Sequence, residues 1–247
     1  MVIAPNPRVF LDFAVGRRAV GRVHFELFHD VLPITAENFR CLCTGETGLG
    51  YWMRPRWYKG SRVHRIIPGF MLQGGDFNYG NGRMGESIYG QSFRDERFCY
   101  KHSKRGVLSM ATSNMRNTVN SQFFVTLAPA PWLDGKHVAF GHVVGGEEVL
   151  EEIEACGTEG GFPHKKVWIS DSGEEDRLLL RRRVLEQPAG GCWTTPQILA
   201  GAAEKAVASA AEQPQVLRPE PLATTPEMSP VPDDVWRRAK AKRDNML

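Results

Sequence analysis

Three segments of the chain mix polar and apolar side chains where an ordinary sheet strand would separate them. They cover residues 63–77, 120–126 and 132–141. In the first, Arg65 lies on a strand-like stretch, although Pro68-Gly69 must disturb its register. A guanidinium supplies charged hydrogen-bond donors to a ligand. Taken alone, such an arginine fits an exposed charge at least as well as a reactive site, and the apolar side chains around it fit an ordinary core.

Residues 80–85, Gly-Asn-Gly-Arg-Met-Gly, match the G-x-G-x-x-G pattern of dinucleotide-binding loops. That mechanism needs a strand before the loop and a helix N-terminus after it. The residues that follow have no helical period and contain Gly90, so we expect a surface loop whose glycines permit positive φ. Cys41-Leu-Cys43 lacks the second ligand pair of a zinc site. No metal and no cofactor are therefore expected.

Composition excludes several classes of function. The 247 residues are 42% hydrophobic and 24% charged, which is typical of globular proteins. A net charge of +3, from 31 basic and 28 acidic residues, is too balanced for a chain whose main partner is nucleic acid. No apolar stretch is long enough to span a membrane, and the N-terminus lacks a secretory pattern. Five irregularly spaced cysteines favour reduced, mostly buried thiols and an intracellular, cytoplasmic protein. The basic clusters 181–183 and 240–243 leave a nuclear location open.

The elements around the three segments are expected to be mainly strands. Hydrophobic alternation predicts them over 9–15, 19–28, 63–75, 106–112, 121–128, 137–144 and 166–173. An amphipathic helix is expected over 33–43, with Ile34, Phe39 and Leu42 toward the core, and a second over 147–156. Seven or eight strands with two isolated helices indicate an antiparallel barrel with helices over its open ends. The histidines outside the three segments, at positions 24, 29, 102, 142 and 164, are expected mostly at the surface.

Composition changes near residue 175, after which prolines and alanines accumulate. We therefore divide the chain into a domain over 1–175 and a C-terminal extension over 176–247. Thr195-Pro196 begins a candidate helix that runs to about residue 212, and 232–245 is a second candidate with acids first and bases last. The segment between them is proline-rich and expected to be extended.

Six sequence blocks resemble the cyclophilin family of peptidyl-prolyl cis–trans isomerases. They are FRCLCTGE, YKGSRVHRIIPGFMLQGGDF, SIYG, LSMA, NSQFFVT and WLDGKHVAFGHV, in the family order, within a similarity that runs from about residue 9 to 173. The resemblance implies a mainly β fold, an eight-stranded antiparallel barrel capped by two α-helices. It also implies rotation of X–Pro bonds in proline-containing proteins or peptides, without metal or cofactor.

The resemblance further assigns the site. Arg65 matches the catalytic arginine, and the other catalytic positions match Phe70, Gln73, Phe124 and His137. The positions expected to bind substrate match Met71, Gly82, Ala111, Thr112, Gln122, Trp132 and Leu133. Trp132 also matches the tryptophan associated with binding cyclosporin-type macrocycles, which are therefore expected inhibitors.

Two departures from the family pattern leave a second function open. The loop 112–116 is one residue longer than usual, with Thr112 where an asparagine is expected, and should alter substrate preference more than activity. Residues 51–57 form an aromatic and basic insertion that is either a partner contact or a divergent loop without a role. The alternative to an enzyme is a docking subunit of a larger assembly, which binds proline-containing loops and contacts its partners through 51–57 and 176–247.

Overall fold

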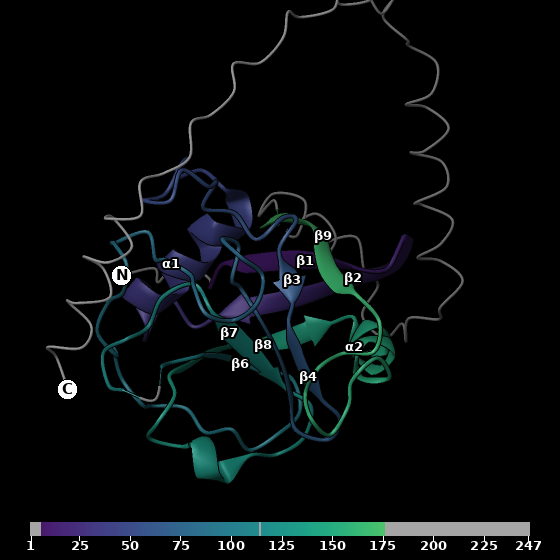
Figure 1. Ribbon diagram of the computed structural model, residues 1–247. Helices are drawn as coiled ribbons and strands as arrows, with labels where there is room; N and C mark the ends of the chain where they lie inside the picture. The colour runs from purple at the N-terminus through teal and green to yellow at the C-terminus, as the bar shows by residue number, and fades with distance from the viewer. Residues whose placement is uncertain (1–5, 114, 176–247) are drawn as a thin grey trace, which may run out of the picture. The chain divides into compact units, whose positions relative to one another are not determined.

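The computed structural model describes residues 6–113 and 115–175 (Figure 1). These residues form one antiparallel sheet with the strand order β3-β9-β1-β2-β8-β6-β7-β5-β4. The strands are β1 (Arg8–Val15), β2 (Arg18–Leu27), β3 (Arg62–Val63), β4 (Arg65–Ile67), β5 (Met71–Gly74), β6 (Val107–Met110), β7 (Phe123–Thr126), β8 (Ala139–Gly145) and β9 (Val167–Glu174). The helices are α1 (Pro33–Thr44) and α2 (Glu147–Glu154), with a 3-10 turn η1 over Pro131–Leu133.

The sheet curls into a nearly closed barrel. Its two end strands, β3 and β4, are consecutive in the chain and separated only by His64. The His64 backbone N–H donates to the Gln73 carbonyl at 3.1 Å, which links the ends of the sheet. The predicted barrel with two helices is thus confirmed, but with nine strands instead of eight. The predicted strand 63–75 divides into three, because the chain changes partners at His64 and turns at Pro68-Gly69, where Gly69 has φ of 69°.

The two helices lie on opposite sides of the strands in Figure 1. Helix α1 packs against β1, β8 and β9, and α2 packs against β2 and β4. The expectation that Ile34 faces the core was wrong, since Ile34 is 49% exposed. The buried stripe of α1 instead runs through Thr35, Phe39 and Leu42. Ile34 lies on the same side of the helix as the buried Asn38 and Cys41, but in the first turn, so its exposure follows from its place at the helix end.

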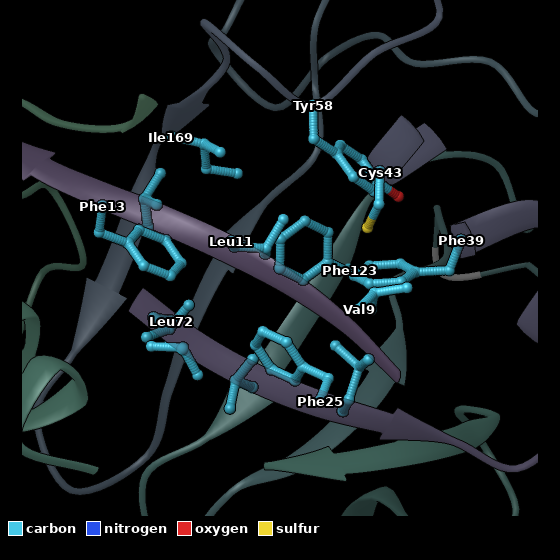
Figure 2. Packing of buried hydrophobic residues seen from close by; sticks show 14 of the residues in the cluster. Val9, Leu11, Phe13, Phe25, Phe39, Cys43, Tyr58, Leu72, Phe123 and Ile169 are labelled. Carbon is cyan, nitrogen blue, oxygen red and sulfur yellow. The ribbon is translucent and has the colours of Figure 1, made fainter. Parts of the chain in front are cut away.

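The interior of the barrel is filled with side chains (Figure 2). The Phe39 ring lies 5.2 Å from that of Phe123 and 5.0 Å from that of Tyr58, measured between centroids. All three rings are fully buried, and the Tyr58 hydroxyl donates to the Ser121 carbonyl at 2.7 Å. Because the interior has no room for a ligand, a binding site must lie on the outer face of the barrel.

The two candidate helices and the proline-rich segment of 176–247 lie outside the described residues. The predicted division of the chain near residue 175 therefore stays a prediction. Among the helices of the described part, none has the length and apolar character needed to cross a membrane.

Candidate active site

Three of the predicted catalytic residues lie in one row across neighbouring strands. Arg65 on β4 pairs with Gln73 on β5, and Gln73 pairs with Phe124 on β7. The next row, Ile66, Leu72 and Val125, is fully buried in the barrel core. Because successive side chains of a strand point to opposite faces, the row that starts at Arg65 points to the outer face.

A second apolar cluster lies beside this row, separate from the barrel core. Met71, Ala111 and Phe124 are its buried members. Its partly buried members are Ile67, Phe70 and Leu133. Trp132 on η1 continues the cluster outward, with its ring 5.6 Å from the Phe70 ring and 56% of its surface exposed. The structure thus brings together the predicted apolar site residues, which are distant in the sequence.

The Arg65 side chain packs closely over Gly161 on the outer face of the barrel. A Cβ atom added at Gly161 would lie 3.0 Å from Arg65 Cγ and 3.2 Å from its Nε, and Gly161 has φ of 85°. The Gly161 carbonyl also accepts the Ile66 N–H at 2.8 Å, which attaches this loop to β4. Arg65 is exposed and has no carboxylate partner within 6–113 and 115–175. The close approach of Gly161 to Arg65 is a contact that the sequence alone did not indicate.

Two glutamines connect the row to the glycine-rich loop. Gln73 Nε2 donates to Gln122 Oε1 at 3.0 Å. Gln122 Nε2 in turn donates to the carbonyls of Gly82 and Met84, at 2.9 and 2.7 Å. These bonds fix the orientation of both side-chain amides. They bring two of the predicted substrate-binding residues, Gly82 and Gln122, into direct contact.

The loop 80–85 is a turn around a carboxylate, and its predicted positive φ values are confirmed. Gly80, Gly82 and Gly85 have φ of 66°, 81° and 140°. Asp76, which is fully buried, accepts backbone N–H groups of this segment, including those of Tyr79 and Gly82. Burial opposes ionisation of Asp76, but the backbone hydrogen bonds outweigh it and hold its pKa below the usual range.

His137 is held as a neutral ring at the edge of the apolar cluster. Its Nδ1 lies 3.0 Å from the Met110 carbonyl, so this nitrogen carries the proton and Nε2 is an acceptor. Its ring meets Phe124 edge to face, with centroids 5.2 Å apart. Burial lowers its pKa, and the hydrogen bond to Met110 opposes that effect only in part.

His102 is fully buried, and is thus an exception to the expectation that most of the histidines outside the three segments lie at the surface. Its ring stacks on Phe124 with centroids 5.8 Å apart and an interplanar angle of 19°. Its Nδ1 lies 2.9 Å from Asp134 Oδ1, and its Nε2 lies 3.0 Å from Ser109 Oγ. His102 therefore packs against Phe124 and helps to fix the position of its ring. The sequence carries no motif or spacing around His102 that predicts its contact with Phe124.

The pKa values of His64, His137 and His142 are all lowered, chiefly because burial disfavours the charged ring. The unfolded chain binds these protons at the usual histidine pKa of about 6.5, whereas the folded chain binds them only at lower pH. The stability they contribute is therefore complete above about pH 7 and is lost as pH falls from about 6.5 through the folded pKa values. Urea unfolding between pH 7.5 and 5.5 should show this decline.

The variant His137→Asn should make that decline smaller, and His29→Asn, at an exposed histidine, should leave it unchanged. A free energy of unfolding that is constant over the same pH interval would contradict the partly buried, neutral state of the three rings.

The divergent loop 112–116 is attached to the segment that leads to His137. Thr112 is half-buried and directly follows Ala111, whose N–H donates to the Gln122 carbonyl at 3.0 Å. Arg116 Nη2 donates to the Gly135 carbonyl at 3.3 Å, and the guanidinium lies 4.8 Å from the centre of the Phe98 ring. The unusual loop thus borders the apolar cluster and forms part of its surroundings.

The insertion 51–57 is exposed at its tip. Tyr51, Trp52 and Met53 are 69%, 44% and 73% exposed, and Leu49 just before the insertion is 54% exposed. Its base is fixed by Glu86, whose buried carboxylate accepts the Tyr51 N–H and the Arg56 Nε–H, the latter at 2.7 Å. The loop is therefore braced at its base.

One further cluster has the composition of a metal site. The ligand atoms of Glu37, Cys41 and Glu46 lie within 4.8 Å of one another. The Arg40 guanidinium, however, donates to both carboxylates, at 2.8 and 2.6 Å. Burial raises the pKa of the Cys41 thiol to about 12, so the thiolate that a metal needs is disfavoured. We assign this cluster to ion pairing at the end of α1.

Residues 10–174 match the family model described as cyclophilin type peptidyl-prolyl cis-trans isomerase/CLD. The match covers well over half of the chain and includes every strand and helix that carries the site. The architecture agrees with it, since both consist of an antiparallel barrel with two helices. The chain therefore belongs to the cyclophilin family.

Proposed function

We propose that this chain catalyses cis–trans rotation of X–Pro bonds in protein substrates. Membership of an isomerase family supports this class of reaction. The observation that carries the proposal is the outward-facing row of Arg65, Gln73 and Phe124 next to a separate apolar cluster. That arrangement presents a charged hydrogen-bond donor and an apolar surface to the same ligand.

The chemistry explains why these residue types suffice. Rotation of an X–Pro bond faces a barrier of roughly 18–20 kcal/mol, which arises from amide resonance. When the amide twists, the prolyl nitrogen loses that resonance and gains a lone pair that accepts a hydrogen bond. A guanidinium placed at that nitrogen stabilises the twisted state more than either planar isomer. Arg65 is the residue proposed for this role.

The neighbouring residues hold the substrate. The apolar cluster around Phe124 receives the proline ring and excludes water, which strengthens the hydrogen bond from Arg65. Gln73, oriented by Gln122, and the neutral His137 supply polar contacts at the edge. The reaction cleaves no covalent bond, so it requires neither a nucleophile nor a cofactor. A millionfold acceleration would require about 8 kcal/mol of preferential binding to the twisted state.

The proposal is tested by the isomerase activity of the variant Arg65→Ala, which should fall far below that of the unmodified chain. Cyclophilins typically bind cyclosporin, and Trp132 beside Phe70 supports the same ligand here. An intracellular location is also proposed, because the described cysteines are free and three of them, Cys41, Cys43 and Cys156, are buried.

A second candidate function is docking in a larger assembly. The observation that favours it is the exposed apolar tip at Tyr51 to Met53, held in place by the buried Glu86. A rigid exposed apolar surface costs little conformational entropy when it binds a partner. The extension 176–247 is proposed as the second contact with such an assembly, on its sequence alone.

The two functions are separated by size-exclusion chromatography of the tagged full chain extracted from its native cells. If docking is the function, Tyr51→Ser/Trp52→Ser should move the chain from a high-mass fraction to the monomer fraction, while Arg65→Ala should not. Tyr79→Ser removes an aromatic side chain that is 62% exposed elsewhere, and serves as the control. A chain that elutes as a monomer without any substitution would contradict docking.

A further inference from the structure

Five exposed cations lie on segments that hydrogen bonds connect to the turn between Trp132 and His137. We call them the basic rim; they are Arg94, Arg97, Lys101, Arg116 and Lys136. None of them has a carboxylate within ion-pair distance among residues 6–113 and 115–175. This local excess of positive charge contrasts with the near-neutral chain, whose net charge is +3.

Hydrogen bonds join the segments that carry these cations into one surface. Asp95 and Asn117 bind each other twice, at 3.2 and 3.0 Å, which connects 94–97 with 115–117. Arg116 donates to the Gly135 carbonyl, next to Lys136. The His102 N–H, next to Lys101, donates to Asp134 at 2.8 Å, which connects 101–102 with the same turn.

The acidic residues of these segments are engaged internally. Glu96 accepts the backbone N–H groups of Ile34 and Thr35, so it satisfies the first turn of α1. Asp134 accepts the His102 N–H, and Asp95 accepts the Asn117 N–H. All three acids are half-buried, while all five cations are exposed. The surface offered to a ligand is therefore positive.

The basic rim continues directly into the active site. Lys136 precedes His137, whose ring contacts Phe124, and His102 stacks on the same phenylalanine. A protein segment with its proline against Phe124 would extend several residues beyond the apolar cluster. At about 3.3 Å per extended residue, neighbouring side chains of that segment come within reach of the rim.

We propose that the basic rim selects X–Pro bonds in acidic segments, with Asp or Glu within a few residues of the proline. This proposal rests on the proposed isomerase function and specifies its substrates. Each exposed ion pair contributes little alone, but several cations around one site attract an acidic ligand together and raise its rate of association. A polyanion such as RNA would need no apolar cluster, and preferential binding of RNA to this surface would contradict the proposal.

The test compares three peptides with the full chain. They share one X–Pro core and carry Glu, Gln or Lys at the flanking positions on both sides. Exchange between the cis and trans forms is measured by NMR, which needs no coupling protease. At low ionic strength we expect kcat/KM for the Glu peptide to exceed that for the Gln peptide by about threefold to tenfold, with the Lys peptide lowest. The ratio should approach one near 1 M salt, where screening acts over about 3 Å.

Two matched variants locate the effect. Arg97→Gln/Lys101→Gln should bring the ratio of Glu to Gln peptides close to one, with the rate on the Gln peptide unchanged. Lys165→Gln/Lys166→Gln removes two exposed cations elsewhere and should leave the ratio as in the unmodified chain. Equal rates on Glu and Gln peptides, or a preference for Glu that survives Arg97→Gln/Lys101→Gln, would overturn the proposal.

Failure of the isomerase proposal has a different signature. If no peptide is isomerised, NMR titration still tests whether the basic rim binds acidic peptides. The Glu peptide must then bind more tightly than the Gln peptide, and its binding must shift the resonances of residues 94–101. A ten-nucleotide single-stranded RNA serves as a competitor. If it displaces the Glu peptide at concentrations below the Kd of that peptide, the surface is a nucleic-acid site and the proposal is wrong.

Discussion

The variant Arg65→Ala is expected to lower kcat/KM for X–Pro isomerisation by about a hundredfold to a thousandfold, the cost of removing one preorganised donor from a transition state. The reason is that the guanidinium is proposed to bind the twisted amide and not the planar one. Because Arg65 is exposed and outside the barrel core, the fold should persist. The measurement is the NMR exchange rate of a neutral peptide, with circular dichroism as the check on folding.

Arg62→Ala provides the matched control, since Arg62 is an exposed arginine on the neighbouring strand β3, outside the row. It should retain nearly full activity. Arg65→Lys keeps the charge but loses the planar pair of donors, so its activity should fall between those of the alanine variant and the unmodified chain. Full activity in Arg65→Ala, with the fold intact, would remove the proposed mechanism.

The variant Glu86→Ala is expected to lower the free energy of unfolding by about 2–3 kcal/mol. The Glu86 side chain is 2% exposed, and its carboxylate binds the Arg56 guanidinium and the Tyr51 N–H. Removing it leaves a guanidinium with 21% side-chain exposure and a backbone donor without their acceptor. A Cβ at Gly50 would lie 1.9 Å from the Glu86 carboxylate, so the loop 50–56 is shaped around this group.

Urea denaturation measures the loss of unfolding free energy. Hydrogen exchange at the Tyr51 amide shows whether that loss arises at the contact with Glu86. Glu86→Gln keeps the shape of the side chain and one acceptor oxygen, and should cost less than Glu86→Ala. The control is Glu148→Ala, at an exposed glutamate of α2, which should leave the midpoint within experimental error. If Glu86→Ala unfolds at the same urea concentration as the unmodified chain, the carboxylate does not brace the loop.

The fold was largely predictable because strand periodicity is a local property. Alternation predicted strands that coincide with β1, β2, β6, β7, β8 and β9, and the family blocks identified the barrel. The run 63–75 was the exception. Its division into β3, β4 and β5 follows from where β9 and β7 lie in space, which no local pattern encodes. Ile34 was misplaced for a similar reason, since the periodicity of a helix does not specify how far along its length other elements cover it.

The candidate site shows the same division. The types and order of Arg65, Gln73, Phe124 and His137 come from the sequence and its resemblance to cyclophilins. The contacts of Gly161 with Arg65 and of His102 with Phe124 could not be predicted from the sequence. Each contact joins segments that are far apart in the chain.

The sequence by itself thus determined the fold class, the family and the identity of the groups proposed to act on an X–Pro bond, since these depend on residue types and short periods. Only the tertiary structure decided that Arg65, Gln73 and Phe124 form one outward row, and that hydrogen bonds connect the segments of five exposed cations, none of which forms an ion pair among the described residues. Strand register and the direction of each side chain depend on pairing between distant segments, and that pairing exists only in the folded barrel.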